Sequence, residues 1–473
     1  MNNNEFRQHA HVLVDWIADY YAHIEQLRVT PDVLPGDIAR KLPALPPENG
    51  TAFTDIFADF EQIIFPGMTH WQHPSFHAYF PANTSPPSVL AEILTAAMGA
   101  QCMVWQTSPA ATELEERVME WIARASGLPT TWQGVIQETA SAATLCALLT
   151  ARECATDFVC NKHGLQGQKQ FAVYCSSETH SSLEKAIKIA GLGSHALRKL
   201  PVDNCFAVLP NALQTAIEQD LTDGIIPLMV VANIGTTSST AIDPVRQIGE
   251  LCQKYRVWLH VDAAFAGSAA FLPEMRSIIT DGLELADSYV FNPHKWLFTN
   301  FDCSAYYVKD KAALLRTFEI MPEYLKTGID AQVNNYRDWG LPLGRRFRAL
   351  KLWFVLRSYG TAGIAQKLRE HLRLAQIFAQ QISEKPNFEV LAPIPLNLVC
   401  FRHVPPSLHS NLNEINEHNA QLLKRVNEHG EVFLTHTKLG ETYAIRAVFG
   451  QTNVAEKHVD KLLAVIERAV LQG

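Results

Sequence analysis

The sequence lacks the features that would direct it to a membrane or a secretory route. No apolar run approaches the roughly 20 residues that a transmembrane helix needs. The first ten residues, MNNNEFRQHA, are polar, so we expect no signal peptide. With 47% hydrophobic and 19% charged residues among 473, the composition is that of a globular protein with two or three domains. We therefore expect a cytoplasmic protein that makes no membrane contact.

Paired cysteines and an excess of positive charge are missing as well. None of the nine cysteines belongs to a C-x-x-C motif, and all are scattered through apolar stretches. This pattern indicates buried thiols in a reducing compartment and argues against a structural zinc site or a disulfide framework. The formal net charge of -8 argues against a nucleic-acid partner. The cysteines are Cys102, Cys146, Cys154, Cys160, Cys175, Cys205, Cys252, Cys303 and Cys400.

Residues 5–26 have the pattern of an amphipathic helix, with apolar side chains at i, i+3, i+4 spacing. A helix this apolar near a chain terminus has to cover either its own core or a partner subunit. Residues 31–47 then form a proline-bearing connector without a periodic pattern. The apolar positions of the helix are Val12, Leu13, Trp16, Ile17, Tyr20, Tyr21 and Ile24.

Residues 85–310 alternate between helical and strand patterns, which is typical of an α/β domain with a mostly parallel sheet. The strand-like runs are continuously apolar, so we expect strands that are buried on both faces. Ligands of such sheets bind beyond the carboxyl ends of the strands. The predicted strands are 171–175, 228–235, 257–263, 288–292 and 303–308, and 244–255 is a predicted helix.

The second half of the chain begins with a long polar segment, residues 319–344, which proline and glycine interrupt. A loop of this length in a compact protein is usually functional or disordered. The next segment, RFRALKLWFVLRSYG, predicts a helix that Gly360 closes, and a smaller α+β domain follows it. We predict three parts: an N-terminal helical segment over 1–84, a large α/β domain over 85–360, and a small domain over 361–473.

Asp262 and Lys295 each follow an apolar strand, in WLHVDAA and in NPHKWL. Buried charges need a partner or neutralisation, and two successive βα units would bring both residues to one sheet edge. An ion pair is one explanation. The other is pyridoxal 5′-phosphate (PLP), which needs a lysine for its aldehyde and a carboxylate for its ring nitrogen.

The other parts of a PLP site can be sought at neighbouring strand ends. GVIQETASAATL places Thr139 and Ser141 at a helix start, where N–H groups favour phosphate, although such residues are often only caps. His180 could stack on a flat ring or be purely structural. Residues 235–240, GTTSST, offer a hydroxyl to the ring oxygen or form an ordinary polar loop. His70, His73 and His77 do not predict a metal site, because Pro74 interrupts their helical spacing.

These residues fall within a longer set of ordered motifs that resembles one family over essentially the whole chain. The chain resembles the group II PLP-dependent decarboxylases, and most closely the aromatic-L-amino-acid decarboxylases. The resemblance implies fold type I of the PLP-dependent enzymes, with homodimers whose active sites are shared between subunits. The motifs are HWQHPSFHAYFPANTS (70–85), SPAATELE (108–115), GVIQETASAATL (134–145), HSSLEKA (180–186), WLHVDAAFAGSA (258–269), NPHKWL (292–297), FDCSAYYV (301–308) and PLGRRFRALKLWFVLRSYG (342–360).

The resemblance also implies a role for each matching residue. Lys295 would bind the PLP aldehyde, Asp262 would pair with the ring nitrogen, and His180 would stack on the ring. Tyr324, in the long loop, would reprotonate the substrate carbon after carbon dioxide leaves. Aldehyde synthases carry phenylalanine at this position. The remaining cofactor residues would be Ala140, Ser141, Thr237, Asn292 and His294, and the substrate wall would contain Trp71, Tyr79, Phe80, Pro81, Gln101, Met103 and Gly344.

The resemblance leaves the individual substrate open. The aromatic pocket segment favours an aromatic amino acid over glutamate, and Gly344 disfavours histidine because the histidine-specific branch has serine there. Gln101, Met103 and Ala82 depart from the animal DOPA enzymes, and residues 101–105 would come from the other subunit. Phenylalanine, tyrosine, DOPA, tryptophan and 5-hydroxytryptophan stay open as substrates. An aldehyde synthase, or a decarboxylase of histidine or an acidic amino acid, is the alternative.

Overall fold

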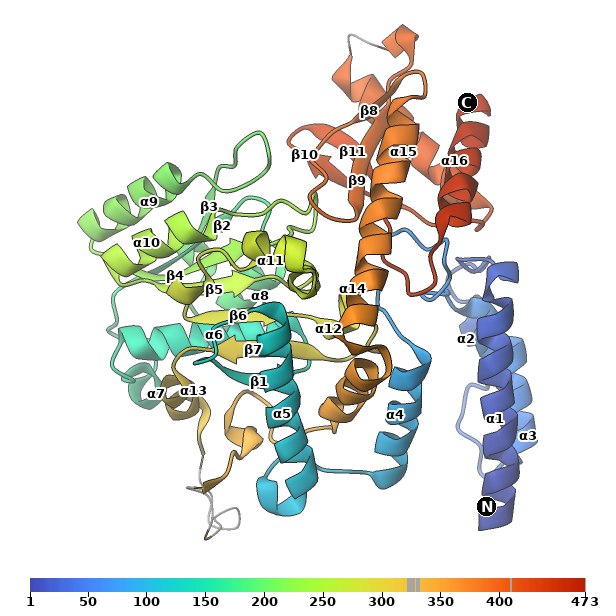
Figure 1. Cartoon of the computed structure of the whole chain (residues 1–473), viewed down its shortest axis with the longest axis horizontal. Helices are drawn as coiled ribbons and strands as arrows, with labels where there is room; N and C mark the ends of the chain where they lie inside the picture. The colour runs from blue at the N-terminus through green and yellow to red at the C-terminus, as the bar shows by residue number, and fades with distance from the viewer. Residues whose placement is uncertain (321–327, 329–331, 409–410, 473) are drawn as a thin grey trace. The chain divides into compact units, whose positions relative to one another are not determined.

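The computed structural model describes residues 1–320, 328, 332–408 and 411–472, and the chain forms two compact units (Figure 1). The large unit comprises Ala82–Ala375 and Ala392–Val399. The small unit comprises Met1–Pro81, Gln376–Leu391 and Cys400–Gly473. Both units are therefore built from stretches that are distant in sequence, whereas the predicted parts 1–84, 85–360 and 361–473 are each continuous.

The large unit is built on a seven-stranded sheet with the order β1-β7-β6-β5-β4-β2-β3. Strands β2 to β6 pair in parallel, and β7 is antiparallel to both of its neighbours, β6 and β1. The prediction of a mostly parallel sheet is thus confirmed. The strands are β1 (Gln133–Gln137), β2 (Phe171–Ser176), β3 (Leu197–Leu200), β4 (Ile226–Asn233), β5 (Trp258–Asp262), β6 (Ser288–Phe291) and β7 (Ser304–Val308).

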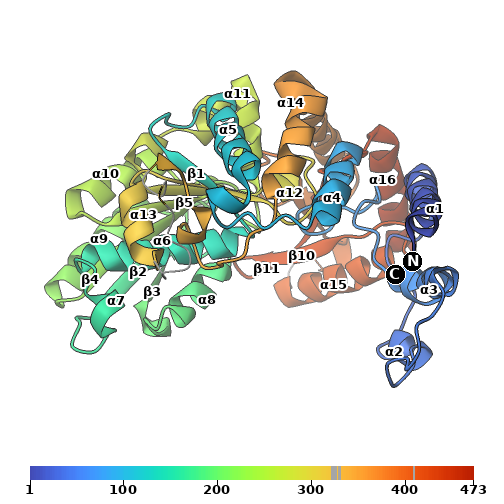
Figure 2. The ribbon, with the colours of Figure 1, turned by 90° about the horizontal axis from the view of Figure 1, so that it is seen from below.

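Helices cover both faces of this sheet, as Figures 1 and 2 show. Because side chains alternate along a strand, Val173 and Cys175 of β2 point to one face, where they join a core with α6 and α8. On β7, Tyr306 belongs to that same core, whereas the hydroxyl of Tyr307 donates to Met119 O (2.8 Å) in α5 on the other side. The continuous apolar runs of the central strands follow from burial on both faces.

The helices of the large unit alternate with its strands, as the sequence predicts. The predicted helix 244–255 is α10, which ends where Arg256 adopts a left-handed conformation (φ 58°). The helices are α4 (Pro86–Met98), α5 (Pro109–Ser126), α6 (Ala140–Ala155), α7 (Cys160–His163), α8 (Ser182–Ile189), α9 (Pro210–Thr222), α10 (Val245–Tyr255), α11 (Pro273–Ile279), α12 (Pro293–Trp296), α13 (Lys311–Phe318) and α14 (Arg348–Ser383), whose last residues, from Gln376, belong to the small unit. Gly360 interrupts α14 with non-helical angles (φ 62°, ψ 169°), so the predicted helix does end there and a second one follows directly.

The small unit combines the N-terminal helices with a four-stranded sheet of order β10-β11-β9-β8. The predicted N-terminal helix is α1, which begins with an Asn2–Glu5 capping box and has no buried residue along its 21 residues. Across the part of the chain that the structure describes, no helix has the length and apolar character to cross a membrane. The elements are α1 (Asn3–His23), α2 (Asp37–Lys41), α3 (Phe53–Asp59), β8 (Phe388–Val390), β9 (Leu398–His403), α15 (Leu412–Glu428), β10 (Thr435–Leu439), β11 (Thr442–Val448) and α16 (Glu456–Leu471).

Candidate active site

The carboxyl edge of the large sheet gathers the predicted chemical residues. Six of the seven strands run in the same direction, because β7 alone is antiparallel to its neighbours, so their carboxyl ends meet at one edge. At this edge β1 leads into α6, β2 into the turn with His180, and β4 into the loop 235–240. β5 ends at Asp262, and β6 leads directly to Lys295.

Lys295 is held by its backbone in the short helix α12. Its N–H donates to Asn292 O (2.9 Å), and its carbonyl accepts from Asn83 Nδ2 (2.8 Å). Burial lowers the pKa of the Lys295 ammonium, and the charge of Asp262 opposes that shift. Asp262 Oδ1 in turn accepts the N–H of Ala264 (2.9 Å), which orients the carboxylate. A lysine whose neutral amine is favoured in this way is the nucleophilic form that carbonyl chemistry requires.

His180 has an oriented ring whose tautomer follows from its hydrogen bonds. Nδ1 accepts the backbone N–H of Ser182 (3.1 Å) and lies 2.9 Å from Ser182 Oγ. Since a backbone N–H can only donate, the neutral ring carries its proton on Nε2. Burial lowers the pKa of His180, the charge of Lys295 lowers it further, and that of Asp262 raises it. The three side chains are therefore within electrostatic reach of one another.

The start of α6 has the donors that a phosphate needs. Thr139 Oγ1 caps the helix by accepting the N–H of Ala142 (3.2 Å), while the N–H groups of Ala140 and Ser141 have no intrahelical acceptor at this position. Asn292 lies nearby in the site, and its Oδ1 accepts the hydroxyl of Ser304 (2.6 Å). That contact leaves the Asn292 amide N–H₂ as the donating end of the side chain.

His294 is a buried neutral imidazole. Its Nδ1 accepts the N–H of Cys303 (2.9 Å), and its ring centroid is 4.6 Å from that of Phe301. Burial lowers the pKa of His294 to about 3, and the charge of Lys295 adds to this effect. His294 can therefore shape the site and donate through Nε2, but it brings no positive charge near neutral pH.

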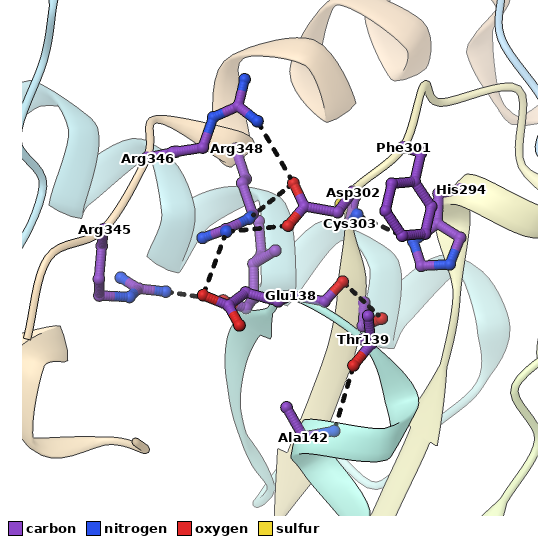
Figure 3. A network of polar contacts seen from close by, with 12 residues as sticks. Glu138, Thr139, Ala142, His294, Phe301, Asp302, Cys303, Arg345, Arg346 and Arg348 are labelled. Carbon is purple, nitrogen blue, oxygen red and sulfur yellow. Dashed lines mark hydrogen bonds and ion pairs between the residues drawn. The ribbon is translucent and has the colours of Figure 1, made fainter. Parts of the chain in front are cut away.

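A network of ion pairs behind the α6 start was not predicted from the sequence (Figure 3). Arg348 contacts both Asp302 (3.0 Å) and Glu138 (3.6 Å), and Arg346 lies 3.7 Å from Asp302. In Figure 3, dashed lines join both Arg346 and Arg348 to Asp302. The network therefore ties α14 to both the α6 start and the segment after α12.

The loop after β4 presents one predicted hydroxyl at the surface of the site. Thr236 is buried, and its Oγ1 accepts the N–H of Ala241 (3.0 Å) inside the loop. Ser239 and Thr240 are buried too, whereas Thr237 is exposed. Among the loop hydroxyls, Thr237 is thus the most exposed one, and Ser238 is half-buried.

Four of the predicted substrate residues belong to the small unit, and two of them, Trp71 and Tyr79, form part of an aromatic cluster. The rings of Trp71 and Tyr79 stack at 5.7 Å, and Phe433, which the sequence did not indicate, packs 6.2 Å from Tyr79. Tyr79 adopts a left-handed conformation (φ 51°), an arrangement that costs energy for an aromatic residue and is typical of functional sites. Phe80 lies under the buried guanidinium of Arg446 at 5.6 Å, and Pro81 follows it.

The three other predicted substrate residues belong to the large unit. Gln101 Oε1 accepts the N–H of Arg345 (2.7 Å), and a Cβ added to Gly344 would lie 3.2 Å from Gln101 Nε2. Met103 is half-buried, and its carbonyl accepts the N–H of Arg337 (2.9 Å). The structure therefore brings Gln101 and Gly344 side by side within one chain.

Tyr324 lies outside the described residues. Among the residues that the structure describes, His, Cys, Asp and Glu side chains form no group that could hold a metal ion, and this includes His70, His73 and His77.

The chemistry of the sheet edge fits PLP. The site offers a lysine of lowered pKa, a carboxylate, an oriented imidazole and a helix start with available N–H groups. These groups match an aldehyde, a pyridine nitrogen, a flat ring and a phosphate, respectively. A simple Lys–Asp ion pair would require neither the oriented imidazole nor the helix start. The edge therefore has the composition of a PLP-dependent enzyme site.

Comparisons with known proteins agree with this class. Residues 35–404 match the pyridoxal-dependent decarboxylase conserved domain, so the chain belongs to this family of PLP-dependent carboxy-lyases. It is 42% identical to an Arabidopsis thaliana phenylacetaldehyde synthase over 99% of this chain and 96% of that protein. It is also 42% identical to tryptophan decarboxylase 2 of Oryza sativa subsp. japonica, over 97% and 93% of the two chains.

A solved structure confirms the fold. The crystal structure of Oryza sativa TDC with PLP and tryptamine superposes with a TM-score of 0.96 and 35% identity, covering 100% of this chain and 99% of that chain. The predicted cofactor, fold class and family are thus confirmed.

Proposed function

We propose that the protein catalyses the PLP-dependent decarboxylation of an aromatic L-amino acid to the corresponding arylalkylamine and carbon dioxide. The observation that carries the proposal is the convergence of Lys295, Asp262 and His180 at one sheet edge, where their charges influence one another. Relatives named for tryptophan and tyrosine decarboxylation, at 42% and 41% identity, support the aromatic class.

In this proposal each residue holds one part of the cofactor. Lys295 would hold the aldehyde carbon, Asp262 the ring nitrogen, and His180 one ring face. The bound cofactor would supply an electron-withdrawing ring conjugated to the substrate amine. Ala140, Ser141 and Asn292 would bind the phosphate. Thr237 would contact the ring oxygen, and His294 would pack beside the cofactor.

The protein's own side chains would then control protonation and contact the substrate. The lowered pKa of Lys295 keeps its amine nucleophilic. The Asp262 carboxylate would hold a proton on the ring nitrogen of the cofactor. Tyr324 would deliver a proton to the substrate carbon. The exposed rings of Trp71 and Tyr79 would offer an apolar, stacking surface to an aromatic side chain.

A substrate screen tests the proposal. Purified protein with PLP is incubated separately with phenylalanine, tyrosine, DOPA, tryptophan and 5-hydroxytryptophan, and with histidine and glutamate for comparison. We expect amine release from at least one aromatic substrate and none from glutamate. The Lys295→Ala variant is the control for cofactor-dependent turnover. Release of amine only from histidine or glutamate would overturn the proposal.

An aldehyde synthase is the second candidate, because phenylacetaldehyde synthases of Arabidopsis thaliana and Petunia hybrida are 42% and 39% identical to the chain. Tyr324 favours the decarboxylase, since the resemblance assigns phenylalanine to this position in aldehyde synthases. The same screen separates the two activities. Aldehyde and hydrogen peroxide in amounts equal to the carbon dioxide released would select the synthase.

We also propose a homodimer in a reducing compartment such as the cytoplasm. The helix α4 leaves an apolar stripe exposed, and the 21-residue helix α1 buries none of its residues. All nine cysteines are free thiols, which fits a reducing compartment. The exposed α4 stripe consists of Leu90, Ile93, Leu94 and Met98.

The oligomeric proposal is tested by charge insertion. Leu94→Glu should shift the sedimenting species from dimer toward monomer, because it places a carboxylate in the apolar stripe. Leu221→Glu is the matched control, since Leu221 is exposed to a similar extent on α9 (47% against 48%). A wild-type protein that sediments as a monomer, or equal effects of the two variants, would contradict the proposed interface.

A further inference from the structure

Asp243 is a buried carboxylate that none of the roles above uses. It is 2% exposed and stands at the end of the loop that follows β4. Its Oδ1 accepts the N–H of Val208 (2.8 Å). Its Oδ2 accepts both the N–H (2.7 Å) and the side-chain Nδ2 (3.0 Å) of Asn233. Three donors therefore converge on this carboxylate, which has only acceptors to offer.

Asn233 returns the contact, so the two residues form a clamp at the base of the loop. The N–H of Asp243 donates to Asn233 O (2.9 Å), and an isolated bridge joins Ile234 to Ile242 immediately inside the clamp. The loop that is closed in this way, residues 234–242, carries Thr237. We call this pair the Asn233–Asp243 clamp.

The clamp also reaches the His180 turn. The second N–H of the Asn233 side chain donates to Thr179 Oγ1 (2.7 Å), and Thr179 directly precedes His180. Thr179 Oγ1 also lies 3.2 Å from Ser176 Oγ at the end of β2, which fixes the turn to its strand. The Asp243 carboxylate thus orients the side-chain amide of Asn233, and this amide in turn holds Thr179, the residue before His180.

The clamp also contacts the strand end that carries Asp262. Asn233 pairs with Asp262 in the sheet, and the N–H of Ile234 donates to Asp262 O (2.9 Å). The clamp therefore links the ends of β2, β4 and β5. Each of these three strand ends carries one residue that the proposed function assigns to the cofactor.

We propose that Asp243 and Asn233 are positioning residues, which hold His180 and Thr237 in the arrangement that PLP needs. The proposal rests on the cofactor contacts proposed for those two residues. Neither Asp243 nor Asn233 has to touch the cofactor for this role. Their contribution is to make the ring support and the ring-oxygen contact rigid before the cofactor binds.

The test measures cofactor binding in the full-length protein. Asp243→Asn keeps the volume but turns one acceptor into an N–H₂ group that faces N–H donors. We expect the PLP dissociation constant of the cofactor-depleted protein to rise about tenfold or more. We also expect weaker induced ellipticity of the bound cofactor, because that signal depends on a fixed orientation of the ring.

Asp287→Asn is the matched control. Asp287 is also buried enough to raise its pKa, and it also accepts a backbone N–H, that of Leu259 (2.8 Å). It lies just before β6, at the opposite edge of the same sheet. We expect Asp287→Asn to leave both the dissociation constant and the ellipticity at their wild-type values. An equal loss in both variants would show general destabilisation and would overturn the proposal.

Thr179 gives a second, milder test if Asp243→Asn does not fold. Thr179→Val removes the acceptor for Asn233 and should reduce the ellipticity, whereas Thr179→Ser keeps the hydroxyl and should restore it. Wild-type affinity and ellipticity in folded Asp243→Asn, or in Thr179→Val, would overturn the proposal. A protein that binds PLP normally but releases no amine would instead contradict the proposed function, so the two failures are distinguishable.

Discussion

The buried pair of Arg345 and Glu115 gives a quantitative prediction for stability. The side chains are only 5% and 3% exposed, and they make two hydrogen bonds, Nη2 to Oε1 (2.8 Å) and Nη1 to Oε2 (3.2 Å). Arg345 also donates to Ile136 O (2.8 Å), and Glu115 Oε1 accepts the N–H of Ile136 (2.8 Å). The pair therefore joins α5, β1 and the segment that holds Gly344.

Arg345→Met would leave the Glu115 carboxylate buried without its counter-ion. Removing one partner of a buried pair typically costs about 3–5 kcal/mol, a large part of the roughly 5–15 kcal/mol that stabilises a typical protein. Adding Glu115→Gln removes the stranded charge, so the double variant should recover part of the loss. The coupling between the two changes is obtained from a double-mutant cycle by denaturant unfolding at neutral pH.

An exposed pair supplies the control for this prediction. Arg369 and Glu274 are 50% and 49% exposed, so Arg369→Met should cost only a small fraction of the loss expected for Arg345→Met. A loss of that small size for Arg345→Met, or a double variant less stable than the single one, would refute the reasoning. The first result would mean that water or other groups replace the contacts of Glu115 in the variant.

Three further predictions concern pH, product and pocket shape. Burial lowers the pKa of His260 from 6.5 to about 4, so between these pH values the unfolded chain binds a proton that the folded chain does not. The free energy of unfolding should therefore fall by about 1.4 kcal/mol per pH unit as the pH drops from 6.5 toward 4. His260→Gln should reduce this slope by the same amount in denaturant titrations. Tyr324→Phe should lose amine and gain aldehyde plus peroxide, as product analysis would show, and unchanged amine output would exclude Tyr324 as the proton donor. Gly344→Ser should displace the Gln101 side chain, whose Nε2 would lie 3.2 Å from the new Cβ, and so raise the KM for the aromatic substrate by several-fold; an unaltered KM would separate Gln101 from the substrate wall.

The strands and their chemical ends were largely predictable because their signals are local. Apolar runs mark β2, β4, β5, β6 and β7, and residues such as Asp262 and Lys295 stand out as charges beside them. The predicted strands did not include β1 or β3. The sequence of β3, LRKL, is largely polar and only partly buried. Gly360 predicted a helix end correctly, but no local signal shows that a second helix starts immediately after it.

The features that the sequence did not predict depend on contacts between segments that are distant in the chain. The small unit joins residues 1–81 to the chain end, as in the bridge between Phe76 and Phe433 and the bond from Val448 N–H to His77 O (2.9 Å), and no local pattern encodes those pairings. The aromatic contact of Phe433 escaped prediction for that reason. Asp243 was overlooked because its partners, Val208 and Asn233, meet it only through the fold.

The most direct test of the central claim quantifies all products of the reaction in one experiment. Purified protein loaded with PLP is given the best aromatic substrate from the screen, labelled in its carboxyl carbon, and labelled carbon dioxide, amine, aldehyde and peroxide are quantified together. The account predicts equal amounts of carbon dioxide and amine, and neither product from Lys295→Ala. Aldehyde and peroxide in place of amine, or undiminished carbon dioxide release by Lys295→Ala, would contradict it.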